Sequence, residues 1–424
     1  TYGWSAKGRL LSVNGPKGLD AQGKDDTFTF TYDATQGKDL LTVTNGLGQV
    51  TTFAGHDANG RPATMTDPNG IVTAFTYDGL GRTKTINRKH PTTGSLDAIT
   101  TLDYDVEGRV IGVTMPSTDK LFIDYDLAGR MTAVRAASGE RIDYGYDAMG
   151  NIMSETTKRI DTTTARAITR TFDELGRMLT ETLGTNRTTS WAYDQNGNPT
   201  QVTTARSNAT VAAFDPLNRL ISATAPDTGV TTLAYNPRDE AISHVDPLTV
   251  TTTFVRNGFG EVIQEVSPDR GTSTYYYDAA GDMTASIDGR GQRIDIVRDA
   301  LGRVKTKTPV GKPASEIVTY TYDTAGIAGS YGVGRLATIV DGSGTTRFKY
   351  DHRGNVLTKQ QTIGTTTLAD LSYVYDLADR ITQITYPSGR LVGYVRDTKG
   401  RVTTVQTKAT AGTASWTSVA SAIQ

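Results

Sequence analysis

Cysteine is absent from the 424 residues, which excludes disulfides, thiol nucleophiles and cysteine-ligated metal ions but does not fix a compartment. No stretch of 18 apolar residues occurs, so no membrane-spanning helix is expected. An excess of charge of one sign is missing too, because 44 Lys and Arg residues are balanced by 45 Asp and Glu residues. This balance gives no support for a nucleic-acid or acidic-membrane partner.

Recognisable catalytic patterns are also missing. No H-E-x-x-H motif, nucleophile elbow or glycine-rich phosphate loop occurs, and the acids lie at turn positions where no acid–base pair can be singled out. We therefore predict no catalytic, cofactor-binding or metal-binding residue, no cofactor and no enzyme activity; a hydrolase would need a convergent site. The few histidines are scattered along the chain, at His56, His90, His244 and His352.

What the chain does contain is a repeat of the form aromatic-D-x-x-G-R, as in Tyr125–Arg130. It occurs in 18 copies, and ten of the 17 intervals between them are 21 residues, while the others are 24 to 28. A fixed period with occasional insertions is typical of a repeat architecture. The Asp position is occupied by Ser5, Asp33, Asp57, Asp78, Asp105, Asp126, Asp147, Asp173, Asp194, Asp215, Asn236, Asn257, Asp278, Asp299, Asp323, Asp351, Asp376 and Asp397.

The spacing of this motif predicts a tight hairpin turn. Asp can accept hydrogen bonds from backbone N–H groups two residues on, and Gly three residues later can adopt the left-handed conformation that closes the turn with a bulge. Gly occupies that position in 14 copies, and Gln36 of another copy is followed by Gly37. The remaining copies carry Asn or Asp, which tolerate positive φ best among the other residues: Asn218, Asp239 and Asp379.

Each unit also contains two strands and an opposite turn. Thr, Val, Tyr, Phe and Ile dominate the runs between turns, and Pro and Gly mark opposite turns such as Asp67–Gly70, Ser267–Gly271 and Pro387–Gly389. The sequence therefore predicts an all-β meander of about 36 strands, most regular between Asp173 and Asp299. Extra residues are expected to lengthen one hairpin end at Lys17–Asp26, Thr85–Thr100, Thr156–Ile168, Ala328–Val333 and Gln361–Ala369.

A meander this long must coil, because twisted open sheets rarely exceed about ten strands. It could fold back as a sandwich or enclose space. Only 37% of the residues are hydrophobic, and runs such as Thr249–Phe254 and Thr272–Tyr277 lack one clean apolar face, so a hollow shell is favoured. A propeller, with two units per blade, would require odd and even units to differ, and they do not.

Two features of the motif could be interpreted as sites. Asp126 and Arg130 flank one turn, but we interpret the pair as a turn residue and a surface charge that pairs across hairpins, an interaction of at most about 1 kcal/mol. The motif aromatics form a periodic row that we expect to pack on one side of the sheet. Alternatively, exposed aromatics such as Tyr276 and Tyr277 could bind carbohydrate or mediate adhesion.

The motif and its period resemble the YD repeats of Rhs proteins, which also occur in shell components of bacterial Tc toxins and in teneurins. Copies such as Tyr77–Arg82, Tyr104–Arg109 and Arg298–Arg303 carry the resemblance. It implies a β-ribbon that spirals into a hollow cocoon and, in bacterial members, encloses a C-terminal toxin. It also implies a structural protein that is produced in the cytoplasm and secreted or delivered from a bacterium. The implied partners are the enclosed toxin, further shell repeats and a secretion or injection apparatus.

The ends of the chain and the family pattern set the expected extent. Residue 1 is Thr, no leader follows it, and Trp416–Gln424 does not form a capping unit. The cleavage core and toxin that follow family shells are not found, since Asp67–Gly70 is an ordinary repeat turn. We therefore expect residues 1–424 to form one continuous repeat array, part of a longer polypeptide, without a separate toxin domain.

Overall fold

The computed structural model describes residues 1–20, 23–34, 37–92, 94, 96–324, 326–397, 400–412 and 415–421. Its elements are strands except for one 3-10 turn, η1 (Ala314–Glu316). The strands are β1 (Tyr2–Trp4), β2 (Leu10–Val13), β3 (Phe28–Tyr32), β4 (Leu40–Thr44), β5 (Val50–Ala54), β6 (Thr64–Thr66), β7 (Val72–Tyr77), β8 (Thr83–Lys89), β9 (Leu96–Tyr104), β10 (Val110–Thr114), β11 (Lys120–Tyr125), β12 (Met131–Ala136), β13 (Arg141–Tyr146), β14 (Ile152–Lys158), β15 (Thr164–Phe172), β16 (Met178–Leu183), β17 (Arg187–Tyr193), β18 (Pro199–Thr203), β19 (Ala209–Phe214), β20 (Leu220–Thr224), β21 (Val230–Tyr235), β22 (Ala241–Val245), β23 (Thr251–Arg256), β24 (Val262–Ser267), β25 (Gly271–Tyr277), β26 (Met283–Ile287), β27 (Arg293–Arg298), β28 (Val304–Pro309), β29 (Val318–Tyr322), β30 (Leu336–Asp341), β31 (Gly344–Tyr350), β32 (Val356–Ile363), β33 (Thr366–Thr367), β34 (Leu371–Tyr375), β35 (Ile381–Thr385), β36 (Leu391–Arg396), β37 (Val402–Lys408) and β38 (Thr417–Ser421).

All 38 strands belong to one sheet in which each strand pairs antiparallel with its neighbour in sequence. The only local exception among the described residues is β32, which pairs with both β33 and β34. The expected all-β meander is confirmed. It has two strands beyond the expected 36, because β33 belongs to a short extra hairpin and β38 follows the last complete unit.

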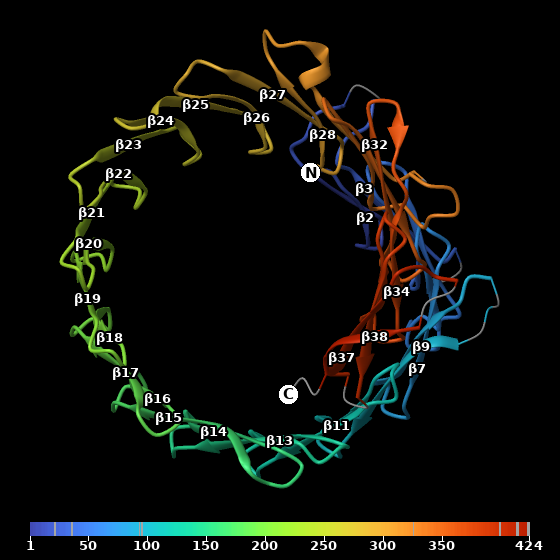
Figure 1. Cartoon of the computed structure of the whole chain (residues 1–424), viewed down its shortest axis with the longest axis horizontal. Coiled ribbons are helices and arrows are strands. Elements are labelled where there is room, and N and C mark those ends of the chain that lie inside the picture. Colours follow the sequence, from blue (N-terminus) through green and yellow to red (C-terminus); the bar gives the residue numbers. More distant parts are fainter. Residues whose placement is uncertain are drawn as a thin grey trace.

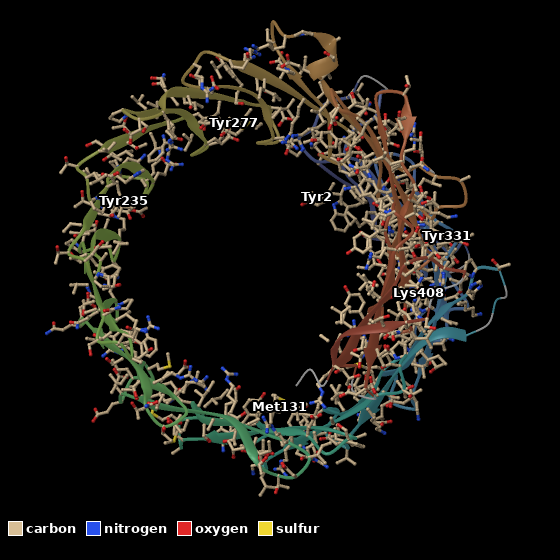
Figure 2. All side chains as sticks on the ribbon, in the orientation of Figure 1. Tyr2, Met131, Tyr235, Tyr277, Tyr331 and Lys408 are labelled. Carbon is tan, nitrogen blue, oxygen red and sulfur yellow. The ribbon has the colours of Figure 1, made fainter. Side chains whose placement is uncertain are left out.

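The sheet curves into an open ring that overlaps itself like a spiral (Figure 1). The chain runs from β2 through β9, β13 and β21 to β28, and the strands from β32 to β38 then lie beside the N-terminal strands. We call one circuit of this spiral a winding. The centre of the ring stays open even with every described side chain drawn (Figure 2), which agrees with the expected hollow shell.

The wall is one layer thick and has no conventional core. Only eight hydrophobic residues count as buried, and no large side chain is fully buried among the described residues. The accessible surface is 24131 Å², whereas a compact protein of 45.5 kDa would expose about 16,000 Å². The excess surface excludes a sandwich. The alternation of buried and exposed positions along the strands is correspondingly shallow.

The insertions lengthen hairpins at two different ends. Four of the five lie at the opposite turns; Thr156–Ile168, for example, extends β14 and β15. The expectation of a single end is wrong for Ala328–Val333, which enlarges a D-x-x-G-R turn. There the Asp323 N–H donates to the Arg335 carbonyl at 3.1 Å, so the glycine preceding the motif Arg is Gly334 (φ 82°) rather than Gly326.

In the part of the chain that the structure describes, no helix is long and apolar enough to cross a bilayer.

Candidate functional site: turn clips and the seam between windings

The D-x-x-G-R turns, hereafter D-turns, have the predicted local structure. Asp126 Oδ1 accepts backbone N–H groups from Ala128 and Arg130, each at 2.9 Å, and Gly129 has φ 79°. The register shift at Asp124/Tyr125 is the expected bulge. Asn218, Asp239 and Asp379 also have positive φ, as predicted; Gly37 has φ 63°, while Gln36 lies outside the described residues.

The motif Arg pairs first within its own turn, and in two copies it also pairs across hairpins as expected: Arg219 with Asp239 and Arg303 with Asp323. Arg130 Nε donates to Asp126 Oδ2 at 2.7 Å, within the same turn. This D-turn is therefore clipped by its own first and fifth residues. The same Asp–Arg clip occurs at Asp57–Arg61, Asp78–Arg82, Asp105–Arg109, Asp173–Arg177, Asp215–Arg219, Asp299–Arg303, Asp376–Arg380 and Asp397–Arg401.

Five copies that lack Arg keep the clip by other means. Asn198 Nδ2 donates to Asp194 Oδ2 at 2.9 Å, so a neutral donor replaces the guanidinium. In the copy that begins with Asn236 the roles are reversed, because its amide donates to Glu240 Oε2 at 2.6 Å. In these copies the clip consists of one donor and one acceptor, whichever side each is on. The copy Asp278–Asp282 differs, because both residues are carboxylates and Asp282 pairs with Lys17 instead.

These hydrogen bonds hold the pKa of several turn carboxyls, among them Asp57 and Asp126, below the usual value. For Asp57, the Arg61 side-chain hydrogen bond, followed by the Arg61 backbone N–H, lowers the pKa to about 2. For Asp126, the Arg130 backbone N–H and then its guanidinium lower the pKa. The carboxylates are therefore ionised at neutral pH because the turn itself stabilises the charge.

The Arg and the aromatic of successive units connect one hairpin to the next. The Arg130 guanidinium lies over the Tyr146 ring at 4.7 Å, and its Nη1 donates to the Asp147 carbonyl at 3.1 Å. The Tyr146 hydroxyl in turn donates to the carbonyl of Met131, the residue after Arg130. The same hydroxyl-to-carbonyl bond occurs from Tyr32, Tyr77, Tyr104, Tyr125, Tyr193, Tyr235, Tyr277, Tyr322, Tyr350 and Tyr375.

This arrangement limits what the aromatic row can bind. A ring covered by Arg on one face, with its hydroxyl committed to a backbone carbonyl, is poorly available as a platform for a sugar. Tyr277 is one of the bonded tyrosines. Tyr276, which is 41% exposed and lies under Arg293 at 5.1 Å, is the more accessible of the two residues considered for binding.

The two windings meet along a seam where opposite turns contact D-turns. Asn69 pairs with the backbone of Val333 through bonds of 3.0 and 2.8 Å, across 264 residues of sequence. The same offset recurs: 265 residues for Arg88 to the Arg353 carbonyl and 261 for Arg401 to Glu140. The ion pairs Lys17–Asp282 and Arg380–Asp119 also join the windings. One winding therefore takes about 261 to 265 residues.

The seam brings together two of the histidines that the sequence shows as scattered. His90 and His352 have ring centroids 5.0 Å apart, whereas His244 lies against Phe254. Among the residues that the structure describes, no group of His, Asp and Glu could hold a metal ion. The expectation of no catalytic, cofactor or metal residues stays a prediction.

Sequence reasoning missed the seam and the reversed clips. The reversed clips could have been predicted from the sequence. In both copies that begin with Asn, a Glu follows four residues later: Asn236–Glu240 and Asn257–Glu261. The seam has no comparable signal, since its contacts depend on how far the sheet curves.

The sequence of this chain matches two family models, and its fold is similar to those of solved structures. The teneurin YD-shell model matches residues 99–293, and the RHS repeat model matches residues 32–70 and 56–92. No curated protein matches it by sequence. Among solved structures, TcdB2-TccC3-TEV has a TM-score of 0.56 at 16% identity, with 96% of this chain and 23% of that chain covered.

A second solved structure with this fold is a Tc holotoxin pore from Photorhabdus luminescens that carries a TccC3 mutation. It has a TM-score of 0.52 at 12% identity, with 91% of this chain and 29% of that chain covered. The chain thus spans about a quarter of the length of these matched chains. At such identities the likeness establishes the fold, a YD-type β-shell.

Proposed function

We propose that this chain, which is a Rhs/YD-repeat protein, is the structural wall of a shell that encloses a toxin cargo until delivery. The wall would work by confinement, because a continuous sheet keeps an enclosed polypeptide away from proteases and from the producing cell. Its own side chains serve the turns and the seam, and the proposal assigns no catalytic step to them.

The observation that supports this proposal best is the self-contact of a one-layer wall. Contacts such as Asn69–Val333 and Arg401–Glu140 close the sheet into a ring without filling its centre. A sheet built only for rigidity or adhesion would gain stability from a packed core, which this wall lacks. The wall therefore lacks the stability that a packed core would give, and this loss is consistent with a need for space inside the ring.

Extent, partners and location belong to the same proposal. We propose that residues 1–424 are one continuous repeat array, supported by their single 38-stranded sheet. The proposed partners are the toxin, further shell repeats and a secretion or injection apparatus. The proposed route is synthesis in a bacterial cytoplasm followed by secretion or delivery, in line with the Tc toxin complexes among the solved structures of this fold.

The proposal is tested on the parent polypeptide that contains this array. Electron cryo-microscopy is expected to show a hollow particle with density inside it, and limited proteolysis is expected to spare the toxin while the shell is intact. A filled particle with the toxin outside the wall, and cleaved as fast as free toxin, would sink the proposal.

Carbohydrate binding is the alternative, and the exposure of Tyr276 is the observation in its favour. A glycan array probed with the chain and with a Tyr276→Ala variant separates the two functions. Saturable binding that the variant loses would favour adhesion. No binding, with cargo protected in the parent polypeptide, would favour the shell.

A further inference from the structure

One contact of the seam is formed by two histidines, one from each winding. His90 follows β8 in the first winding, and His352 lies in the D-turn that begins at Asp351 in the second. Their ring centroids are 5.0 Å apart, with 61° between the rings. Their residue numbers differ by 262, which is within the 261 to 265 residues of one winding. The contact therefore belongs to the regular seam.

Cations lie beside this contact. Arg88, on β8, donates through Nη1 to the Arg353 carbonyl at 3.3 Å, so one hydrogen bond between the windings is two residues from His90. Lys89 lies between them in the sequence. The Arg353 side chain is 8% exposed, and its Nη1 is buried without a hydrogen-bond partner among the residues that the structure describes. Further positive charge at this place is therefore unfavourable.

Tyr331 packs on the His352 ring from the second winding. The two ring centroids are 6.2 Å apart, and the Tyr331 carbonyl accepts a hydrogen bond from Arg335 Nη1 at 2.5 Å. Two residues further on, the Val333 N–H donates to Asn69 Oδ1 across the seam at 2.8 Å. A short segment thus connects the His352 ring to a second hydrogen bond between the windings.

The carboxylates at this D-turn are already paired. Asp351 Oδ1 accepts the N–H groups of Arg353 and Asn355 at 2.9 and 2.8 Å, and its Oδ2 accepts Asn355 Nδ2 at 3.1 Å. Asp379 Oδ1 lies 3.2 Å from Arg353 Nε. These acids serve the turn and the cation that is already there, so they do not offset charge added on the histidines.

Protonation would also cost His90 a hydrogen bond. Its Nδ1 accepts the Thr92 N–H at 3.3 Å, which requires a lone pair that a protonated imidazole lacks. The geometry at this ring is therefore suited to the neutral form.

From these contacts we infer that the His90–His352 pair makes the seam sensitive to acid. Neutral rings join the windings, whereas two protonated rings at this distance repel each other and separate them. Histidine ordinarily gains its charge near pH 6.5, and carboxylates ordinarily stay ionised above about pH 5, so the ion pairs of the seam are expected to persist. The seam is thus closed at neutral pH and opens as the pH falls through about 6.5. This property of the wall goes beyond the proposed enclosure of a cargo.

Hydrogen exchange of the whole chain at about pH 7.5 and about pH 5.5 tests the inference. The reporter is the Val333 N–H, which bonds across the seam, and the reference is the Gly260 N–H, which bonds within its own D-turn. The ratio of the two rates removes the intrinsic effect of pH on exchange. It is expected to rise about tenfold in acid, the order set by two partly screened charges at this distance. An unchanged ratio overturns the inference.

Two neutral substitutions identify the groups that respond. The double variant His90→Gln and His352→Gln cannot gain charge, and its ratio is expected to stay within about twofold between the two pH values. The matched control is His244→Gln, because that ring packs on Phe254 in the part of the ring that is one winding deep, and it should keep the full rise. A double variant that rises as much as the unmodified chain would show that acid acts elsewhere, and would overturn the inference.

A permanent charge at the same position separates repulsion from other effects of acid. His352→Lys is expected to raise the ratio several-fold already at about pH 7.5. Circular dichroism should keep the strand signal, because the ladders between neighbouring strands are unchanged. A folded His352→Lys variant whose ratio equals that of the unmodified chain would contradict the role of charge at this contact.

Discussion

In the D-turn at Asp126, one aspartate bonds to three parts of the turn. Asp126 accepts two backbone N–H groups with one oxygen and the motif Arg with the other, while its own carbonyl accepts Gly129 N–H. The Arg then reaches the next unit through Tyr146. Because no core exists, these local bonds replace part of the stabilisation that burial gives a compact protein.

The tyrosine hydroxyl is expected to contribute measurably to stability. Tyr193→Phe removes the bond from its hydroxyl to the Met178 carbonyl (2.8 Å) and is expected to lower the free energy of unfolding by about 1 kcal/mol. Tyr276→Phe is the control, because that side chain is 41% exposed, and it should change stability little. Denaturant titration of both variants makes the comparison, and equal effects would contradict the proposed link between units.

The clip can be tested by exchanging its donor and acceptor. Arg130→Glu places two carboxylates at positions one and five and is expected to lower the thermal midpoint. Adding Asp126→Asn recreates the Asn–Glu arrangement of Asn236–Glu240 and should restore part of the loss. Recovery is expected to be incomplete because the contact with Tyr146 is gone. A double variant less stable than Arg130→Glu alone would refute the exchange rule.

Stability is expected to decrease at acidic pH. The pKa of Asp57 is lowered from 3.8 to about 2, so its stabilising contribution is complete above the unfolded value and is lost as pH falls from about 4 to about 2. The thermal midpoint should fall over this range. It should fall less in Asp57→Asn, which cannot titrate, and identical acid profiles for the two proteins would contradict this assignment.

At the scale of the hairpin, the two turns are built alike but with different residues. D-turns use Gly, Asn or Asp for the left-handed residue, as the sequence indicates. Several opposite turns instead place Thr there, with φ 69° at Thr118, 71° at Thr228 and 65° at Thr249. A β-branched residue is strained in this conformation, so these turns are less stable than they could be.

Thr249→Asn is therefore expected to stabilise the chain by roughly 0.5 to 1 kcal/mol, because Asn adopts positive φ more readily than Thr. Thr251→Asn, on the adjacent strand β23, is the control and should be neutral or destabilising. Differential scanning calorimetry measures both. A lower thermal midpoint for Thr249→Asn would show that the Thr side chain has a compensating role.

At the scale of the whole molecule, the wall has two kinds of contact with different strengths. Neighbouring strands share continuous ladders, such as the seven pairs between β31 and β32. Windings share isolated contacts, such as Asn69–Val333 and Arg401–Glu140, and Arg401 is 60% exposed. The spiral should therefore open at the seam before its strands separate.

Seam variants are expected to widen the ring without unfolding it. Asn69→Ala combined with Glu140→Ala removes the partners of Val333 and Arg401. Small-angle X-ray scattering should give a larger radius of gyration, while circular dichroism keeps its strand signal. Asn196→Ala, in a D-turn of the part that is one winding deep, is the control. An unchanged radius in the seam variant would mean that the ladders alone set the curvature.

The strands, the D-turns and the repeat were predictable from the sequence, because a turn depends on four or five consecutive residues whose φ preferences and hydrogen bonds are local. One turn glycine was still predicted wrongly. The motif spacing indicates Gly326, but an insertion in that turn places Gly334 before the motif Arg. The contacts of Asn69 with Val333 and of His90 with His352 were not predictable in this way and are known from the three-dimensional structure alone. Those contacts depend on small twists between neighbouring strands that add up from β6 to β30, and no local residue pattern encodes their sum.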